Sequence, residues 1–186
     1  MSTSGIHGVE GFAGSAIQLS ILNDLEKIPQ NIAFIFVHIL NPWGMSWLRR
    51  ENESNVDLNR NFLQDNEPYK GSHPHYAKLD PIINIKKMPQ KINLFNIRML
   101  LHGLIYGQIK TKQAYAEGQY DFPKGLHFGG HKLEKGPRLL IEWLKIKLAN
   151  VKSCIWIDLH TGLGEPGEDA LLVDLYPENE KYIKLE

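Results

Sequence analysis

Residues 32–37 read IAFIFV, a short apolar run with turn residues before it and His38 after it. β-Branched and aromatic side chains without polar alternation predict a strand that is covered on both faces. Residues 154–159, CIWIDL, form a second run of this kind, which leads directly into His160. Strands covered on both faces are typical of parallel sheets layered between helices, so the two runs together predict an α/β fold.

Helical spacing surrounds these runs. Apolar residues at spacings of three and four predict an amphipathic helix over 12–28 that ends at Pro29. Similar spacing predicts helices over 92–117, with weak points at Gly103 and Gly107, and over 134–150. The first helix carries its apolar stripe on Ile17, Ile21, Leu22, Leu25 and Ile28. No repeat or linker divides the chain, so we expect residues 1–186 to form a single domain, a three-layer α/β/α fold with a mixed, largely parallel sheet.

Composition limits the partners and the compartment. Lys plus Arg equals Asp plus Glu at 21 each, so the whole chain has no excess charge to hold nucleic acid or an anionic membrane, and we expect neither as a partner. The single cysteine, Cys154, excludes an intrachain disulfide and favours a reducing, cytoplasmic location. Its apolar surroundings in the sequence predict a small buried side chain rather than a nucleophile.

The segment 41–68 is long and rich in Asn, Arg and Glu, and it has no clean period. Loops of this length in compact domains are usually either functional or disordered. Its apolar and aromatic residues Trp43, Trp47, Leu58 and Phe62 favour order. The segment is therefore predicted to be an ordered, functional loop.

Three polar elements fall where the edge of such a sheet would lie. HGVE (7–10) enters the first helix, VDLNRN (56–61) lies in the long loop, and His160 ends the second strand. Ligands of open α/β sheets bind beyond the carboxyl ends of the strands. Two imidazoles and one carboxylate are a ligand set for catalytic zinc, so His7, Glu10 and His160 are candidate ligands of one Zn²⁺ ion. The alternative is an ordinary polar loop, because a lone His-x-x-Glu spacing arises often by chance.

The long loop offers groups that a hydrolytic zinc site also needs. Arg60 can bind a substrate carboxylate through its planar guanidinium, with Asn59 beside it. Asp57 can orient a zinc-bound imidazole, and Arg49 or Arg50 can polarise a scissile carbonyl. The alternative is an Asn/Asp-rich capped turn with solvated arginines.

The ordered set of motifs resembles the zinc carboxypeptidase superfamily, and most closely its branch known as the domain of unknown function 2817. That branch is related to the aspartoacylase and succinylglutamate desuccinylase branch. The similarity spans almost the whole chain. It is carried by His7-x-x-Glu10, Asn41-Pro42-x-Gly44, Arg49-Arg50, Asp57-Leu58-Asn59-Arg60-Asn61-Phe62 and Asp158-Leu159-His160-Thr161-Gly162.

The resemblance implies a role for each matching residue. His7, Glu10 and His160 would bind zinc, and Asp57 would support the first histidine. Asn59 and Arg60 would bind the terminal carboxylate of the substrate, and Arg50, preferred to Arg49, would face the scissile carbonyl. The implied activity is that of a zinc-dependent hydrolase of carboxypeptidase or amidohydrolase type. Such an enzyme cleaves an amide bond next to a free carboxylate, in a small peptide or an N-acyl amino acid.

The chain departs from the family pattern at both ends. The glutamate that serves as general base in the family lies several tens of residues beyond the third ligand, and Glu165 and Glu168 are the nearby substitutes. Relatives have sheet strands before the HxxE loop, where this chain has only Met1–Ile6. We therefore expect an incomplete domain with exposed sheet edges that can pair with another chain. The alternative function is that of a non-catalytic relative that binds zinc or a carboxylate ligand.

Overall fold

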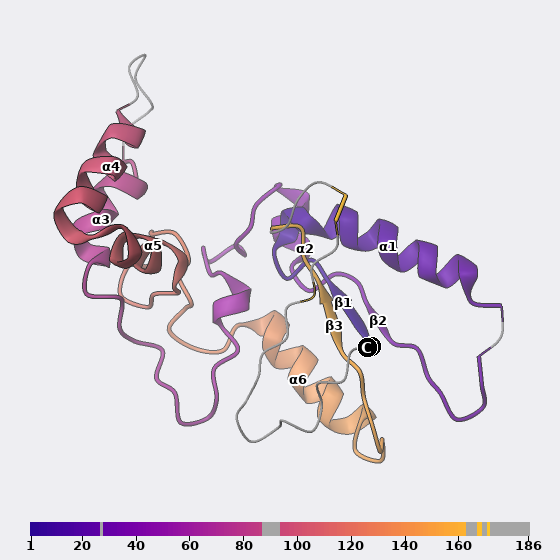
Figure 1. Cartoon of the computed structure of the whole chain (residues 1–186). Helices are drawn as coiled ribbons and strands as arrows, with labels where there is room; N and C mark the ends of the chain where they lie inside the picture. The colour runs from indigo at the N-terminus through magenta and orange to yellow at the C-terminus, as the bar shows by residue number, and fades with distance from the viewer. Residues whose placement is uncertain (27, 87–93, 163–166, 169–170, 172–186) are drawn as a thin grey trace.

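A computed structural model describes residues 1–26, 28–86, 94–162, 167–168 and 171 (Figure 1). The strands are β1 (Ser2–Ser4), β2 (Phe36–Val37) and β3 (Ile157–Leu159). The helices are α1 (Gly11–Asp24), α2 (Pro42–Ser46), α3 (Tyr76–Ile83), α4 (Phe95–Tyr106), α5 (Gln108–Ala116) and α6 (Lys135–Lys147). Two 3₁₀ turns, η1 (Gly8–Glu10) and η2 (Leu58–Arg60), complete the described elements.

The described strands form one parallel sheet in the order β2-β1-β3. Thr3 pairs with Val37 on one side and with Asp158 on the other. The α/β prediction is confirmed, but β1 was missed, because the six residues before His7 were expected to add no strand. A polar three-residue strand shows no readable alternation, and only its two neighbours identify it as the centre of the sheet.

Helices cover both faces of this sheet, as the three-layer prediction requires. Ser4 faces α1, where its hydroxyl donates to Gln18 Oε1 at 3.2 Å. Val37 pairs with Thr3 and therefore lies on the opposite face from Ser4, since side chains alternate along a strand. There it packs against the core cluster to which α6 contributes Leu140.

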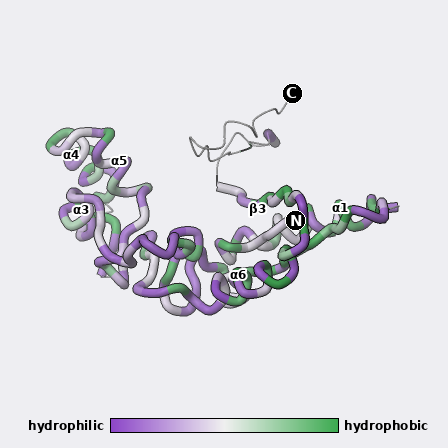
Figure 2. Tube along the Cα trace, turned by 90° about the horizontal axis from the view of Figure 1, so that it is seen from below, coloured by the Kyte–Doolittle hydropathy of each residue, from purple (hydrophilic) through white to green (hydrophobic). Residues whose placement is uncertain are grey.

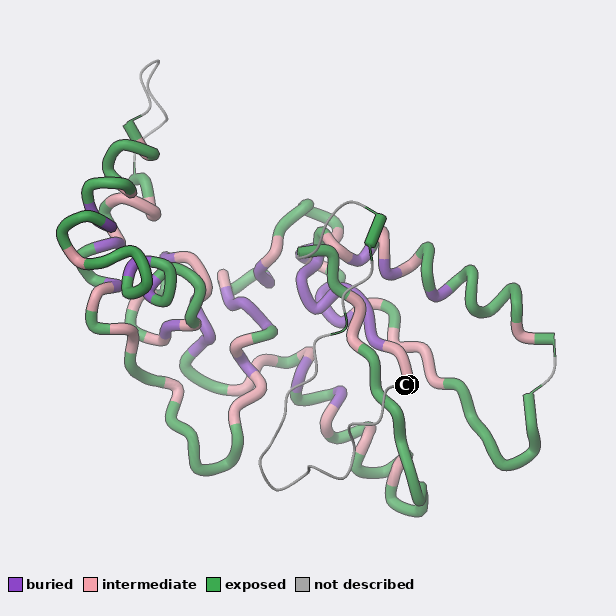
Figure 3. The backbone as a smooth tube through the Cα atoms, in the orientation of Figure 1, coloured by how far each residue is buried: buried purple, intermediate pink, exposed green. Residues whose placement is uncertain are grey.

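The packing face of α1 differs from the prediction. The helix ends at Asp24 rather than at Pro29, and its buried residues are Gly11, Gly14 and Gln18. A Cβ added at Gly14 would lie 2.5 Å from Ser4 Cβ, so the small residue lets the helix approach the strand closely. The predicted apolar stripe instead faces outward along much of the helix (Figure 3).

Both predicted strands are shorter than their apolar runs. Only Phe36–Val37 of the first run and Ile157–Leu159 of the second are strand. Ile155 is 77% exposed and Cys154 is exposed as well, so the prediction of burial for this run is wrong.

The long loop is ordered, as predicted, and it supplies part of the core. It contains α2 and η2, and Val56 and Leu58 are each only 2% exposed. These two side chains belong to the buried cluster of Ile6, Leu40, Val56, Leu58, Phe128 and Leu140. The loop is thereby fixed against the end of the sheet.

Helices α3, α4 and α5 pack on one another in a lobe that stands apart from the sheet (Figures 1 and 2). The helix predicted over 92–117 is two helices, which separate at Gly107 with φ of 93°, while residues 92–93 lie outside the described part. Helix α3 was not predicted. None of the helices in the described ranges has the length and apolar character needed to cross a bilayer.

Candidate metal centre

The HGVE loop is held by close backbone packing. After β1 the chain turns at Gly5, which has φ of +64°, a conformation that glycine adopts without strain. A Cβ at Gly8 would lie 2.2 Å from the carbonyl carbon of Gly44, so η1 and α2 can approach this closely only with glycine at position 8. The amide of Val9 donates to the Arg49 carbonyl at 2.9 Å. These contacts fix the positions of His7 and Glu10.

The three predicted metal ligands meet at this point. His7 Nδ1 lies 3.1 Å from Glu10 Oε1, and His160 Nδ1 lies 3.1 Å from Glu10 Oε2. The two Nδ1 atoms lie 3.2 Å apart. The side chains of His7 and Glu10 are 4% and 9% exposed, whereas that of His160 is 32% exposed, so the cluster opens to solvent at His160. The cluster forms because β1, which precedes His7, and β3, which precedes His160, are neighbours in the sheet.

The spacing of these donors fits a metal ion. Their ligand atoms all lie within 4.8 Å of one another. Donors placed about 2.0–2.1 Å from a tetrahedral zinc ion lie roughly 3.3 Å apart, close to the spacings observed here. Two imidazole nitrogens at 3.2 Å also need a proton or a cation between them. The residues present therefore suit a metal ion such as zinc.

A carboxylate lies next to the Nε2 atom of each imidazole, on the side of the ring away from Glu10. His7 Nε2 is 3.2 Å from Asp57 Oδ1, in ion-pair range although not in hydrogen-bond geometry. His160 Nε2 is 2.7 Å from Asp158 Oδ2. Such carboxylates fix the orientation of metal-binding imidazoles. Sequence reasoning found Asp57 but missed Asp158, although its position two residues before His160 puts both side chains on one face of β3.

Asp57 is fully buried, and its neighbours are one guanidinium and two imidazoles. Arg50 Nε donates to Asp57 Oδ2 at 3.0 Å, and His127 Nδ1 lies 3.3 Å from the same oxygen. Burial by itself would raise the pKa of Asp57, but His127, His7 and Arg50 hold that pKa far below its usual range. His127 therefore belongs to the site, whereas a structural role was favoured for it from the sequence.

The pKa values of the cluster follow from these contacts. Burial lowers the pKa of His7, but Asp57 and Glu10 outweigh it and leave that pKa above its ordinary value. Burial would raise the pKa of Glu10, but His160 and His7 hold it far below the usual range. Asp158 and then Glu10 raise the pKa of His160 to about 9. Without a metal ion His160 is protonated at neutral pH, so an incoming ion must displace protons.

The two adjacent arginines occupy different positions. Arg50 reaches Asp57 and is 32% exposed, whereas Arg49 is 51% exposed and pairs with Glu51 at 3.6 Å. Asn41 holds this segment, because its Nδ2 donates to the Arg50 carbonyl at 3.2 Å while its Oδ1 accepts from the Gly44 amide at 2.9 Å. Of the two arginines, Arg50 is the one that contacts Asp57, the carboxylate next to His7.

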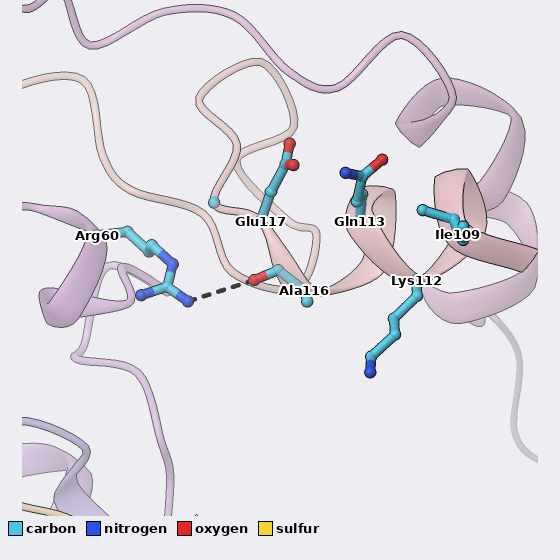
Figure 4. A pocket seen from close by; sticks show the side chains of 7 residues that line it. Arg60, Ile109, Lys112, Gln113, Ala116 and Glu117 are labelled. Atoms are coloured by element: carbon cyan, nitrogen blue, oxygen red, sulfur yellow. Dashed lines mark hydrogen bonds between the residues drawn. The ribbon is translucent and has the colours of Figure 1, made fainter. Parts of the chain in front are cut away.

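The predicted carboxylate-binding pair follows Asp57 closely in sequence, and the Asn59 amide donates to Asp57 Oδ1 at 3.1 Å. Asn59 is exposed, and Arg60 Nη2 donates to the Ala116 carbonyl at 3.3 Å. Figure 4 shows the Arg60 guanidinium pointing toward the end of α5. It lines an open pocket of about 670 Å³ together with Lys112, Gln113 and other residues of α5. The lining also includes Glu117, so Arg60 and Lys112 leave it with one net positive charge, which suits an anionic group.

The remaining predictions concern the general base and the supporting loop. Glu165 lies outside the described residues, and Glu168 is exposed. Asn61 was assigned no role from the sequence, yet it is fully buried, and its Nδ2 donates to the carbonyls of Gly129 and Lys132 at 2.7 and 2.9 Å. Through these hydrogen bonds Asn61 connects the end of η2 to the loop that carries His127.

Comparison with known proteins places this site in a family. A search of curated proteins and a search of solved structures found no match. A family model described as "Protein of unknown function (DUF2817)" matches residues 1–186. Because the match covers the entire chain and includes every residue of the metal cluster, this chain belongs to the DUF2817 family.

Proposed function

We propose that this chain carries the metal centre of a zinc-dependent hydrolase of carboxypeptidase or amidohydrolase type. The supporting observation is the paired arrangement of His7 and His160. Both present Nδ1 to Glu10 and Nε2 to a carboxylate. A solvated polar loop has no reason to place two imidazole nitrogens 3.2 Å apart with acceptors behind both.

The proposed substrates are small peptides or N-acyl amino acids, cleaved at an amide bond next to a free carboxylate. Zinc held by His7, Glu10 and His160 would supply Lewis acidity toward a carbonyl oxygen and would activate water. Asp57 and Asp158 keep the two imidazoles in the orientation that exposes Nδ1 to the ion. The opening at His160 leaves one side accessible to substrate.

Two arginines have separate roles in this proposal. Arg50 polarises the scissile carbonyl with the guanidinium nitrogens that Asp57 does not engage. Arg60 and Asn59 bind the substrate carboxylate, and the pocket that Arg60 shares with Lys112 provides the positive charge for it.

A second candidate is a protein that binds zinc or a carboxylate ligand without turnover. It is favoured by one observation: in the described part of the chain, the carboxylates that contact the two imidazoles are Glu10, Asp57 and Asp158. Each of them is already committed as a ligand or an orienting group. A hydrolase needs a further base to accept a proton from water.

Metal content tests the shared part of both candidates. Purified protein is expected to hold about one zinc ion per chain. His160→Ala should reduce this to a small fraction, whereas His131→Ala, which removes an exposed histidine elsewhere, should leave it unchanged. Equal zinc content in the wild type and His160→Ala would overturn the metal assignment.

Activity separates the two candidates. Release of an amino acid from an N-acyl amino acid or a dipeptide is measured with the zinc-loaded chain. Zinc-dependent release that disappears in His160→Ala and falls at least about a hundredfold in Arg50→Ala supports the hydrolase. Full zinc occupancy without release supports the binding protein.

A further inference from the structure

Helix α4 is apolar on its outer side. Its exposed large side chains recur at spacings of three and four, which places them on one face of the helix. His102 and Gly103, on the opposite side, are buried against the rest of the lobe. We call the exposed set the α4 face: Ile97 (54% exposed), Leu100 (56%), Leu101 (50%), Leu104 (69%) and Ile105 (69%).

The sequence around the α4 face is strongly basic. From Pro81 to Ala116 the chain has six lysines and arginines and no aspartate or glutamate, although the whole chain is neutral. Of these cations, Arg98, Lys86, Lys110 and Lys112 are described and exposed. Lys78 of α3 adds another positive charge, with its ammonium 4.4 Å from the centre of the Tyr106 ring. The lobe therefore combines an apolar face with several cations, and Asp80 is the one acidic residue within its three helices.

Outside the lobe, two other helices expose large apolar side chains. Helix α6 exposes Ile146 at 75% between Lys145 and Lys147. It also contains Glu142, however, which pairs with Arg138 at 3.0 Å.

The charge around the α4 face distinguishes it more sharply from α1. Helix α1 also exposes large side chains, including Phe12 at 53% and Leu19 at 56%, but it contains no lysine or arginine. An interface between protein surfaces can use either helix, whereas an anionic lipid surface attracts only the basic one. Figure 2 shows the α3–α5 lobe at the end of the molecule away from α1.

We propose that the α4 face binds peripherally to the surface of an anionic lipid bilayer. The apolar side chains enter the boundary between headgroups and acyl chains while the helix lies in the plane of the surface. Arg98, Lys110 and Lys112 remain at headgroup level, because their long side chains keep the charge in water. The neutral balance of the whole chain gave no sign of this partner, because the acidic residues that balance these cations lie mostly outside the lobe.

Vesicle flotation tests the proposal with the full chain. Vesicles of phosphatidylcholine alone are compared with vesicles that contain on the order of 30 mol % phosphatidylglycerol, at low and high salt. The protein is expected to float with the anionic vesicles and to dissociate at high salt. Leu104→Glu should lower the partition coefficient at least about tenfold. Ile146→Glu, which changes a 75% exposed isoleucine on α6, is the matched control and should leave binding unchanged.

The contribution of the cations to lipid binding is tested with a separate double variant. Arg98→Glu combined with Lys110→Glu should lower binding to anionic vesicles by more than tenfold and leave binding to neutral vesicles as it was. His160→Ala should bind vesicles like the wild type, so loss of the metal site and loss of lipid binding are distinguishable. The proposal is overturned if anionic vesicles recover no protein, or if Ile146→Glu loses as much binding as Leu104→Glu. A dimer in sedimentation that Leu104→Glu converts to monomer, without vesicle binding, would instead assign the face to a second copy.

Discussion

Replacing Asp158 with asparagine should change the pH dependence of zinc binding more than its strength at neutral pH. The substitution keeps the size of the side chain and removes the charge that faces His160 Nε2 at 2.7 Å. Two opposing effects result. The imidazole loses a partner that makes it a stronger ligand, and it also loses the main cause of its raised pKa.

The magnitudes follow from the structure. With a pKa of about 9, His160 is protonated in roughly 99% of chains at pH 7, so the proton lowers the apparent zinc affinity about a hundredfold. Moving that pKa toward the ordinary value of about 6.5 removes much of this competition. Loss of an orienting carboxylate costs about 10- to 100-fold in affinity. The two effects therefore offset one another near pH 7, whereas above pH 9 only the loss remains.

The assay is a competition titration against a chromogenic zinc chelator at several pH values between 6.5 and 9.5. The ratio of wild-type to Asp158→Asn affinity should rise with pH, from near one to about 10–100. Asp65→Asn, an exposed change of the same kind, should give a ratio near one throughout. A ratio for Asp158→Asn that stays constant with pH would refute the reasoning, because it would mean that Asp158 does not set the proton affinity of His160.

Three further outcomes are expected. Gly8→Ala places a Cβ 2.2 Å from the Gly44 carbonyl carbon. It should therefore destabilise the chain by about 1–3 kcal/mol in urea denaturation and lower its zinc content. An unchanged free energy of unfolding and zinc content would contradict the close packing of η1 on α2. Asp57→Asn leaves Arg50 and two imidazoles without their buried carboxylate, and should lower the free energy of unfolding of the metal-free protein by about 2–4 kcal/mol. The cost is smaller than for a fully buried ion pair because Arg50 is 32% exposed. A decrease of less than about 0.5 kcal/mol would argue against these ion pairs. The raised pKa of His160 stabilises the metal-free fold below about pH 6.5, by about 1–2 kcal/mol after solvent screening. This contribution should disappear as pH rises through 9. An unfolding temperature that does not decrease between about pH 6.5 and 9.5 would contradict it.

The metal cluster could be predicted because its residue types are specific. Few kinds of side chain bind zinc, and those of His7, Glu10 and His160 lie at places that the sequence pattern marks, at the start of a helix and at the end of a strand. Helix α6 was predicted nearly to its bounds, because its apolar and polar residues alternate with a helical period. Arg50 and Asp57 were chosen from motifs, and the structure brings them into contact.

Other elements could not be predicted, because they are buried through polar or small residues rather than through the apolar residues that a hydrophobic pattern detects. Helix α1 packs through Gly14 and Gln18, while the apolar residues used to predict its buried face point outward. Strand β1 is polar and three residues long. Its position in the sheet depends on hydrogen bonds with β2 and β3, which lie far from it in sequence.

The sequence alone determined the fold class, the ordered loop and the ligand types, because these depend on local pattern and side-chain chemistry. Tertiary structure decided the rest. The distances from His160 Nδ1 to Glu10 and to His7, 3.1 and 3.2 Å, depend on the pairing of β1 with β3, which are far apart in the chain. His127 gained its role through tertiary packing too, since a carboxylate acts on an imidazole only within a few ångströms, whereas Asp158 faces His160 from two residues away in the chain. Sequence spacing does not set the distances that join His160 to His7 and His127 to Asp57, because parallel pairing and loop packing bring together residues that the chain itself keeps apart.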